Sequence, residues 1–327
     1  MNIYDIAEKC GVSIATVSRV LNNSPLVGEK TRQAVLSVIE KSNYTPNAYA
    51  RGLGLNTMQM IGVLCTDVSD IYYAKAVSLV ERNLRDNKFD SLLACSGYAL
   101  SDKKDRVSHM IQKGVDAIIL IGSVFREESD NSHIQQAAAL VPVILINGLV
   151  DIDNVYCVLC DEREAMRKNV HYLAERNCRN ILYIYDVKTY SESQKMEGLC
   201  SGLTECAIQG RQIQINTLGS FDGIQAQVEK QLREDPSFDA VLASSDYLAV
   251  GALKAMKACG RQLPLIGFDN SAYSMCASPE ITSVDNGLET LCDLSTNILV
   301  DLLGGKTPPK KIVISAKLVE RETFRLK

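Results

Sequence analysis

The 327-residue sequence contains no tryptophan and only three histidines, and aromatic residues make up 6% of it. None of the histidines, His109, His133 and His171, stands in a catalytic or metal-binding motif. A glycine-rich phosphate loop is missing after the first expected strand, and so is a G-x-S-x-G nucleophile motif. We therefore expect no catalytic activity, no metal ion and no cofactor.

No apolar run reaches the roughly 18 residues that a membrane-spanning helix needs. An N-terminal export signal is also missing, and with eleven cysteines this predicts free thiols in a reducing cytoplasm. Cys157 and Cys160 form a C-x-x-C pair, but no second pair stands at zinc-ligand spacing. Alternation along a strand would place these two thiols on opposite faces. We expect a cytoplasmic protein without a membrane partner.

The net charge of −4 is not that of a typical nucleic-acid-binding protein. The charge is unevenly distributed, however. Residues 1–57 contain six Lys and Arg against four Asp and Glu, whereas the remainder contains 29 basic and 35 acidic side chains. A mildly basic head on an acidic body favours DNA binding through the head alone.

The first 53 residues have the pattern of a small helical domain. Apolar residues recur at helical spacing before Gly11, which ends a first helix, and Ser13 can cap a second. In that second helix, Val17, Val20 and Leu21 face one way. The opposite face carries small residues, one Arg and one Asn, namely Ala15, Ser18, Arg19 and Asn22. A third apolar stripe follows at Val35, Val38 and Ile39. This arrangement predicts a helix-turn-helix whose second helix enters the DNA major groove.

Specific residues strengthen this interpretation. The segments 3–7, 11–13, 16–22, 31–32, 44–47 and 50–53 stand in order and at family spacing. They resemble the head of the LacI/GalR (lactose-repressor/galactose-repressor) family of bacterial transcription regulators. We expect base contacts from Ile14, Ala15 and Arg19, since Arg on guanine is the most frequent specific contact. Contacts to phosphates are expected from Tyr4, Ser13, Thr16, Ser18, Asn22 and Thr31.

Residues 47–57 are expected to form a hinge between the head and the rest of the chain. Asn47 can cap a short helix that ends at Leu53, although such a helix is too short to persist alone in water. The resemblance implies that two hinge helices pair in the minor groove, where Leu53 wedges between base pairs and bends the duplex.

From residue 61 onward, short apolar runs alternate with helical stretches. We expect strands at 61–65, 91–95, 117–122, 143–147, 155–159, 181–185, 214–218, 240–244 and 265–268, and helices that include 74–87, 106–113, 162–176 and 247–259. Continuously apolar strands separated by helices predict two α/β lobes, each a doubly wound parallel sheet. A ligand would bind between the lobes, at the carboxyl ends of the strands.

The resemblance extends over essentially the whole chain, and it implies a periplasmic-binding-protein-like core. The matching segments include 179–181, 245–246, 267–270 and 319–322. In the family the chain crosses between the lobes three times. The expected domains are therefore a head at 1–46, a hinge at 47–57 and a core at 58–327. Within the core, the first lobe would contain about 58–160 and 284–311, and the second about 161–283 and 312–327.

Six residues are candidates for the effector site. By resemblance, Asp269 binds ligand hydroxyls, Phe221 forms an aromatic platform, and Tyr73 lies at a ligand position. Ser245 and Asp161 are further candidates. Lys195 stands where the family usually has an Arg, and a single ammonium lacks the planar fork that grips two oxygens.

These observations predict a sequence-specific, dimeric repressor that binds a near-palindromic operator. A small molecule between the lobes, a sugar or sugar derivative, would control its DNA affinity. The alternatives are a repressor controlled by a protein partner or one that responds to no small ligand, and more distantly a solute receptor or an enzyme.

Overall fold

The computed structural model describes residues 2–21, 24–42, 57–216 and 220–326. These residues form two compact units, Met1–Met60 and Ile61–Lys327. Asn22, Asn47 and Leu53, together with most of the expected hinge, lie outside the described residues.

The first unit contains the predicted helix-turn-helix. Its helices are α1 (Ile3–Cys10), α2 (Ile14–Leu21) and α3 (Glu29–Lys41). Gly11 ends α1 with a φ of 61°, which glycine adopts at little cost. The Thr16 backbone N–H donates to Ser13 Oγ at 3.2 Å and so caps α2. The apolar faces of all three helices meet in one core, around the buried side chains Ile6, Ala7, Val17, Val20 and Val35.

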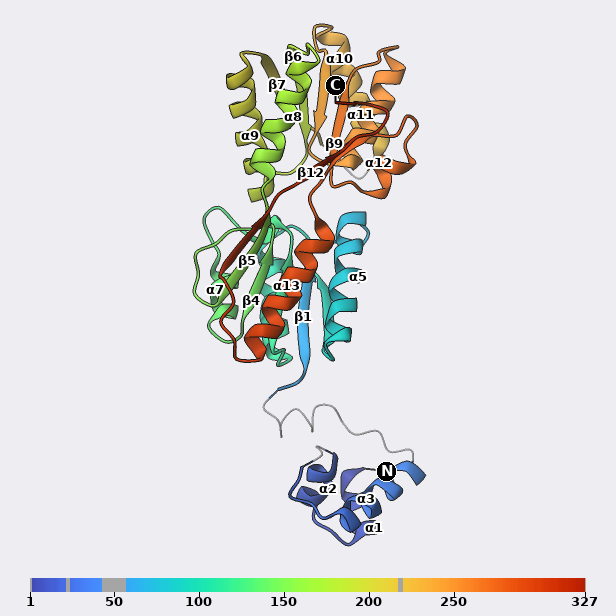
Figure 1. The fold of residues 1–327 in the computed structure, drawn as a ribbon, viewed down its shortest axis with the longest axis vertical. Helices are drawn as coiled ribbons and strands as arrows, with labels where there is room; N and C mark the ends of the chain where they lie inside the picture. The colour runs from blue at the N-terminus through green and yellow to red at the C-terminus, as the bar shows by residue number, and fades with distance from the viewer. Residues whose placement is uncertain (1, 22–23, 43–56, 217–219, 327) are drawn as a thin grey trace. The chain divides into compact units, whose positions relative to one another are not determined.

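The second unit consists of two six-stranded sheets covered by helices (Figure 1). The first sheet has the order β11-β5-β4-β3-β1-β2. Its strands are β1 (Met60–Cys65), β2 (Asp90–Cys95), β3 (Ala117–Ile121), β4 (Val143–Ile146), β5 (Val155–Cys160) and β11 (Lys311–Ile314). Its helices are α5 (Ile71–Asp86), α6 (Leu100–Gln112), the 3-10 turn η1 (Ser123–Phe125), α7 (Ser132–Ala138) and α13 (Leu288–Leu303).

The second sheet has the order β12-β10-β9-β8-β6-β7. Its strands are β6 (Asn180–Tyr185), β7 (Gln209–Gln214), β8 (Ala240–Ala243), β9 (Leu265–Phe268), β10 (Thr282–Asp285) and β12 (Lys317–Val319). Its helices are α8 (Glu162–Glu175), α9 (Tyr190–Cys206), α10 (Phe221–Glu234), α11 (Asp246–Ala258) and α12 (Ala272–Cys276). Strand β12 is antiparallel to β10, whereas β6 to β10 pair in parallel.

Burial explains why apolar runs in the sequence predicted the central strands. Every residue of β3, β4, β5, β8 and β9 is buried, as expected where helices cover both faces of a parallel sheet. Three large apolar clusters of this unit lie between the sheets and their helices. The fold class is therefore the predicted one, a helical head and a two-lobed α/β core.

Several strands at or near the sheet edges differ from the expectation. A strand is expected at 214–218, of which residues 217 and 218 lie outside the described ones; strand β7 occupies Gln209–Gln214 and is almost entirely exposed. Because β7 is an edge strand with five polar or glycine residues out of six, it has no apolar run to reveal it. Strands β10, β11 and β12 were also not predicted, since they are short and only partly apolar.

The chain crosses between the lobes after β5, after β10 and after β11, and Figure 1 shows these three segments together at the junction. The last two crossings fall later than the expected limits of 283/284 and 311/312. Strand β10 keeps the chain in the second sheet through Asp285, and β11 keeps it in the first sheet through Ile314. Ile314 is in register with Cys160 of β5, so the chain can cross back to the second lobe only after Ile314.

All eleven cysteines are described, and all are free thiols. In the part of the chain that the structure covers, no group of three or more potential ligands could hold a metal ion. The same residues include no helix whose length and apolar character would let it cross a membrane.

Candidate functional site

The polar face of α2 is turned away from the core of the first unit. Ala15 and Arg19 are exposed, and Ile14 is 40% exposed although it is a large apolar residue. Ser18 and Thr16 are half-buried, and the Thr16 hydroxyl lies 2.9 Å from Ser13 Oγ. A helix face with exposed Ile, Ala and Arg is suited to the edges of bases in a major groove.

Two candidate phosphate-contacting residues lie on the other helices of this unit. Tyr4, near the start of α1, is 66% exposed. Thr31 lies in the first turn of α3 and is half-buried. Hydroxyl groups at helix starts are typical donors to DNA phosphates.

The second unit holds a cavity of about 560 Å³ between its lobes, at the carboxyl ends of the parallel strands. From the first lobe it is lined by the segment before α5, by α5 itself and by residues after β2, β3 and β4. From the second lobe it is lined by residues after β6, β8 and β9 and by the starts of α9, α10 and α11. The polar and charged lining residues are Asp67, Ser69, Asp70, Tyr72, Tyr73, Tyr98, Ser123, Asn147, Glu162, Asp186, Thr189, Ser191, Glu192, Lys195, Ser244, Ser245, Tyr247, Asp269, Ser271, Tyr273 and Asn286.

The structure brings five of the six candidate effector residues to this cavity. Tyr73, Lys195, Phe221, Ser245 and Asp269 all line it. Asp161 does not line it; its exposed carboxylate caps α8 by accepting a hydrogen bond from the Glu164 backbone N–H at 3.0 Å. The neighbouring Glu162 lines the cavity instead and is 4% exposed.

Sequence reasoning missed several lining residues that follow strand ends. Asn147 comes directly after β4, Asp186 directly after β6, and Asn286 directly after β10. The rule that selected Asp269 after β9, a polar residue directly after a parallel strand, would have found Asp186, whereas Asn147 lay within the strand expected at 143–147. Asn286 could not be found this way, because β10 was not predicted.

Lys195 is buried within a ring of partners. Its Nζ donates to the Ser244 carbonyl oxygen at 2.9 Å, lies 4.0 Å from the centre of the Phe268 ring, and is 3.9 Å from Glu162 Oε1. Burial acts to lower the pKa of Lys195, but the negative charges of Glu162 and Asp269 outweigh it and the pKa is raised. The ammonium therefore stays charged and serves to balance buried carboxylates.

Several carboxyl groups around the cavity are poorly solvated. Burial raises the pKa of Glu192 to about 7, while its Oε1 accepts a hydrogen bond from the Tyr183 hydroxyl at 2.6 Å. Loss of solvation raises the pKa of Asp269 to about 8. The pKa values of Asp70 and Asp186 are raised for the same reason. The cavity thus holds carboxyl groups that a ligand's donors would favour in their charged form.

A network below the cavity fixes the loop that carries Asp269. The carboxylate of Asp246 accepts hydrogen bonds from the Ser283 hydroxyl at 2.6 Å and from the Ser271 backbone N–H at 2.6 Å. Asp269 has a φ of 96° and Asn270 a φ of 49°, conformations that ordinary residues adopt only when the surroundings hold them. Arg321 Nη2 donates to Asn270 Oδ1 at 2.6 Å and adds a further restraint.

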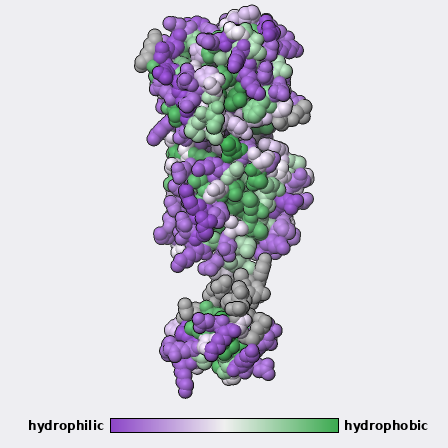
Figure 2. Space-filling view, turned by 90° about the vertical axis from the view of Figure 1, so that its right-hand side faces the viewer, coloured by the Kyte–Doolittle hydropathy of each residue, from purple (hydrophilic) through white to green (hydrophobic). Residues whose placement is uncertain are grey.

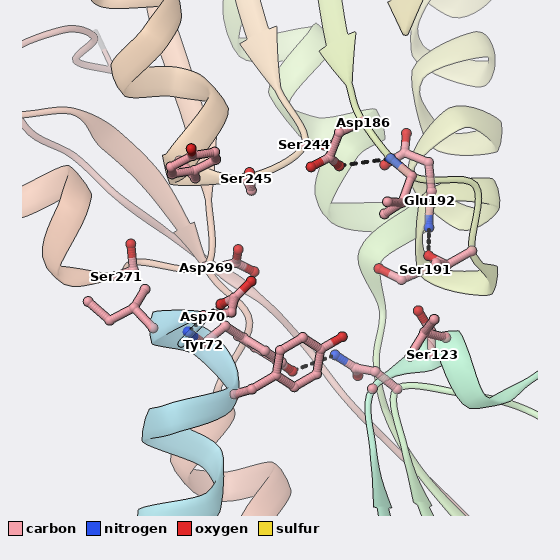
Figure 3. Close-up of a pocket in the computed structure, with 18 of the residues that line it drawn as sticks. Asp70, Tyr72, Ser123, Asp186, Ser191, Glu192, Ser244, Ser245, Asp269 and Ser271 are labelled. Carbon is pink, nitrogen blue, oxygen red and sulfur yellow. Dashed lines mark hydrogen bonds between the residues drawn. The ribbon is translucent and has the colours of Figure 1, made fainter. Parts of the chain in front are cut away.

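One wall of the cavity is aromatic. The Phe221 ring centre lies 4.5 Å from that of Tyr247 and 5.8 Å from that of Tyr273. The Tyr247 and Tyr273 ring centres are 5.7 Å apart. Figure 3 shows hydroxyl and carboxyl groups pointing into the same space, including those of Ser245, Asp269 and Ser271. A cavity with an aromatic wall and many convergent oxygens suits a small polar ligand that has an apolar face.

Comparison with known proteins agrees with both units. Residues 2–47 match the family model "Bacterial regulatory proteins, lacI family", and residues 170–324 match a periplasmic binding protein-like domain. An HTH-type transcriptional regulator of Lachnoclostridium phytofermentans is 43% identical, with 99% of both chains covered. Catabolite control protein A of Priestia megaterium is 30% identical, with 99% of this chain and 98% of that protein covered.

Among solved structures, the Lac repressor dimer bound to operator and the anti-inducer ONPF superimposes with a TM-score of 0.86. It is 22% identical, and 99% of this chain and 98% of that chain are covered. The transcriptional regulator CelR in complex with cellobiose has a TM-score of 0.71 at 23% identity, with 99% of this chain and 100% of that chain covered. Because its relatives over the full length are transcriptional regulators, this chain is not an enzyme but a DNA-binding transcriptional regulator and a member of the lacI family.

Proposed function

We propose that this regulator is a homodimeric, cytoplasmic repressor that binds a near-palindromic operator and is controlled by a small molecule between the lobes of its core. The observation that carries the proposal is the combination of an exposed DNA-binding face on α2 with a polar cavity at the junction of two lobes. A symmetric dimer places two such helices on half-sites about one helical turn apart.

In this proposal the residues of the first unit divide into two groups. Ile14, Ala15 and Arg19 contact base edges, because their side chains project from the face of α2 opposite its buried residues. The remaining residues position the head on the sugar–phosphate backbone, namely Tyr4, Ser13, Thr16, Ser18, Asn22 and Thr31. Asn47 and Leu53 act in the hinge, where Leu53 inserts into the minor groove.

The dimer is supported by exposed apolar surface on the two-lobed unit. Figure 2 shows hydrophobic residues running along the middle of one face of this unit, between hydrophilic margins. Strand β2 ends the order of the first sheet, and its residue Leu93 is 44% exposed. An unpaired edge with exposed apolar residues is a surface that soluble proteins usually cover. The solved Lac repressor to which this chain is similar is a dimer.

The effector is a sugar or sugar derivative, bound by Tyr73, Lys195, Phe221, Ser245 and Asp269. The aromatic wall offers a platform for the apolar face of a sugar ring, and the serines and carboxylates offer partners for its hydroxyls. Solved relatives of similar fold contain cellobiose and ribose. A ligand that binds the closed lobes better than the open lobes shifts the population and with it the geometry of the two hinges.

Selection of DNA sequences by the full-length chain tests this function. We expect a palindromic site from the wild type, and a relaxed preference at one position of each half-site from Arg19→Ala. Arg85→Ala changes an exposed Arg on α5 that pairs with Glu81 and serves as the matched control. If Arg19→Ala selects the same site as the wild type, the assignment of Arg19 to a base is wrong.

A further inference from the structure

The cavity between the lobes is lined by many more carboxyl groups than basic side chains. Six carboxyl groups line it, from Asp67, Asp70, Glu162, Asp186, Glu192 and Asp269. Among the described residues that line it, the only cationic side chain is Lys195. That ammonium is already held by the Ser244 carbonyl oxygen, the Phe268 ring and the nearby Glu162. The described part of the cavity wall therefore offers these carboxyl groups no second cation.

Carboxyl groups of both lobes line this cavity. Asp70 comes from the start of α5 in the first lobe, whereas Asp186 and Asp269 follow strands of the second lobe. In Figure 3 the carboxyl groups of Asp70 and Asp269 lie near the middle of the cavity. Loss of solvation is the main cause of the raised pKa values of Asp70 and Asp269, and repulsion between carboxylates of the two lobes adds to it. A cation placed between the lobes would favour the charged form of these carboxyl groups.

Two further features indicate a ligand rich in hydrogen-bond donors. Asn286 is 1% exposed and lines the cavity, and its Oδ1 accepts no hydrogen bond from any described residue. Its Nδ2 donates to Asp269 Oδ1 at 3.0 Å, which fixes the amide with its oxygen available to a donor. The rings of Phe221, Tyr247 and Tyr273 line the same cavity, and the Phe221 ring already interacts with a cation, since Lys254 Nζ lies 5.5 Å from its centre.

We propose that the effector carries a protonated amine on a polyhydroxylated skeleton, as an amino sugar does, and that the amine lies between Asp70 of the first lobe and Asp186 and Asp269 of the second. This inference rests on the proposed function, because it names the chemical class of the ligand in the same cavity. The positive charge would favour the charged form of these carboxyl groups, attract both lobes and so favour their closure. The same carboxylates reject phosphorylated and acidic sugars.

Thermal unfolding of the full-length chain at neutral pH tests the charge of the ligand directly. The probes are glucosamine, galactosamine and mannosamine, each compared with its N-acetyl derivative, its parent hexose and its hexose 6-phosphate. We expect at least one amine to raise the Tm by several degrees at a saturating concentration. The corresponding N-acetyl compound, which has the same skeleton without the charge, should have little effect at that concentration.

The variant Asp70→Asn removes the charge and keeps the cap of α5, because Asn caps helices as well as Asp does. It should weaken binding of the amine about tenfold or more, as expected for the loss of a charge-assisted contact. Asp86→Asn makes the same change at the exposed other end of α5 and should bind like the wild type. Asp186→Asn, whose amide oxygen still accepts from the Val187 backbone N–H, should repeat the effect of Asp70→Asn.

The inference is overturned if a neutral or phosphorylated sugar stabilises the chain as much as its amine counterpart, or if none of the three amines stabilises it. Operator binding separates these results from a failure of the proposed function. If a neutral sugar stabilises the chain and alters its affinity for the selected operator, the proposed function stands. Only the proposal that the effector carries an amine is then contradicted. A full-length chain that selects no DNA site contradicts the function itself.

Discussion

The side-chain amide of Asn286 donates to Asp269 Oδ1 at 3.0 Å, and this bond links the second crossing between the lobes to the ligand cavity. Asn286 directly follows β10, and α13 of the first lobe begins two residues later. Asp269 directly follows β9 of the second lobe. A ligand that changes the protonation or position of Asp269 would therefore act on a segment that joins the two lobes.

The raised pKa of Asp269 makes the ligand-free protein less stable as the pH increases. The carboxyl group has a pKa of about 8 in the folded chain and 3.8 as its ordinary value, so the folded state binds the proton more tightly. Folding stability contributed by this group is present below the unfolded pKa and is lost as the pH rises through the folded one. We expect the Tm of the wild type to fall between about pH 5 and pH 8, and Asp269→Asn to reduce that fall. Parallel pH profiles of equal slope for the two proteins would contradict this origin.

Lys195 balances buried carboxylates, and its removal should destabilise the second lobe. Lys195→Ala leaves Glu162, which is 4% exposed, without its nearby ammonium and the Ser244 carbonyl oxygen without its donor. Loss of one member of a buried pair costs about 3–5 kcal/mol in the free energy of unfolding. Denaturant unfolding monitored by circular dichroism measures this change. Lys168→Ala removes a half-exposed partner of Glu164 and should cost less than about 1 kcal/mol. Equal stabilities of the two variants would show that Lys195 has no balancing role.

Substitutions at two isoleucines of the first unit distinguish an effect on folding stability from an effect on DNA recognition. Ile6 is fully buried in its core, and Ile6→Ala should destabilise that unit by about 2–5 kcal/mol and abolish DNA binding. Ile14 is 40% exposed, so Ile14→Ala should leave the unit folded while changing the preferred bases of the selected DNA. Binding assays on the selected operator and calorimetric unfolding of the full chain distinguish the two outcomes. A loss of folding in Ile14→Ala would contradict its assignment to the DNA-binding face.

Gly198 allows α9 to pack closely against α8. A Cβ atom at this position would lie 2.1 Å from the Arg163 carbonyl oxygen, which is backbone and has no freedom to rotate away. Gly198→Ala should therefore lower the Tm, although Ala is the better helix former by about 1 kcal/mol. Cys200→Ala, on the exposed part of the same helix, is the matched control and should unfold near the wild-type temperature. An increased Tm for Gly198→Ala would show that the two helices can move apart without cost.

The sequence was sufficient where burial and local spacing determine the structure. The strands β3, β4, β5, β8 and β9 are apolar throughout because both of their faces are covered, so their apolar runs are visible without an alignment. The edge strand β7 and the strands next to the crossings have no such run. Their formation depends on pairing with residues far away in the chain, such as Ile314 with Cys160. Local patterns carry no information on such pairing.

The position of the cavity could be predicted from the sequence, but only some of its lining residues could. The expectation of a ligand at the carboxyl ends of parallel strands led to Ser245 and Asp269, and both line the cavity. The balance of charge in the cavity was not visible, because Asp70, Asp186 and Glu192 come from separate segments that only the tertiary fold brings together. Asp161 and Glu162 are neighbours in the sequence, and the turn of α8 alone decides that Glu162 faces the cavity.

The pairing of β5 with β11 also constrains how the chain can fold as it leaves the ribosome. The helix-turn-helix consists of consecutive residues and can acquire its core as soon as α3 has emerged. The first lobe cannot complete its sheet until late in synthesis. Its last strand begins only at Lys311, after the main body of the second lobe has been synthesised. The outer edge of β5 thus stays without its neighbour from the synthesis of Cys160 until β11 has been made. Nascent chains stalled before Lys311 should contain a folded head and an incomplete first sheet. We expect chaperones to bind such chains.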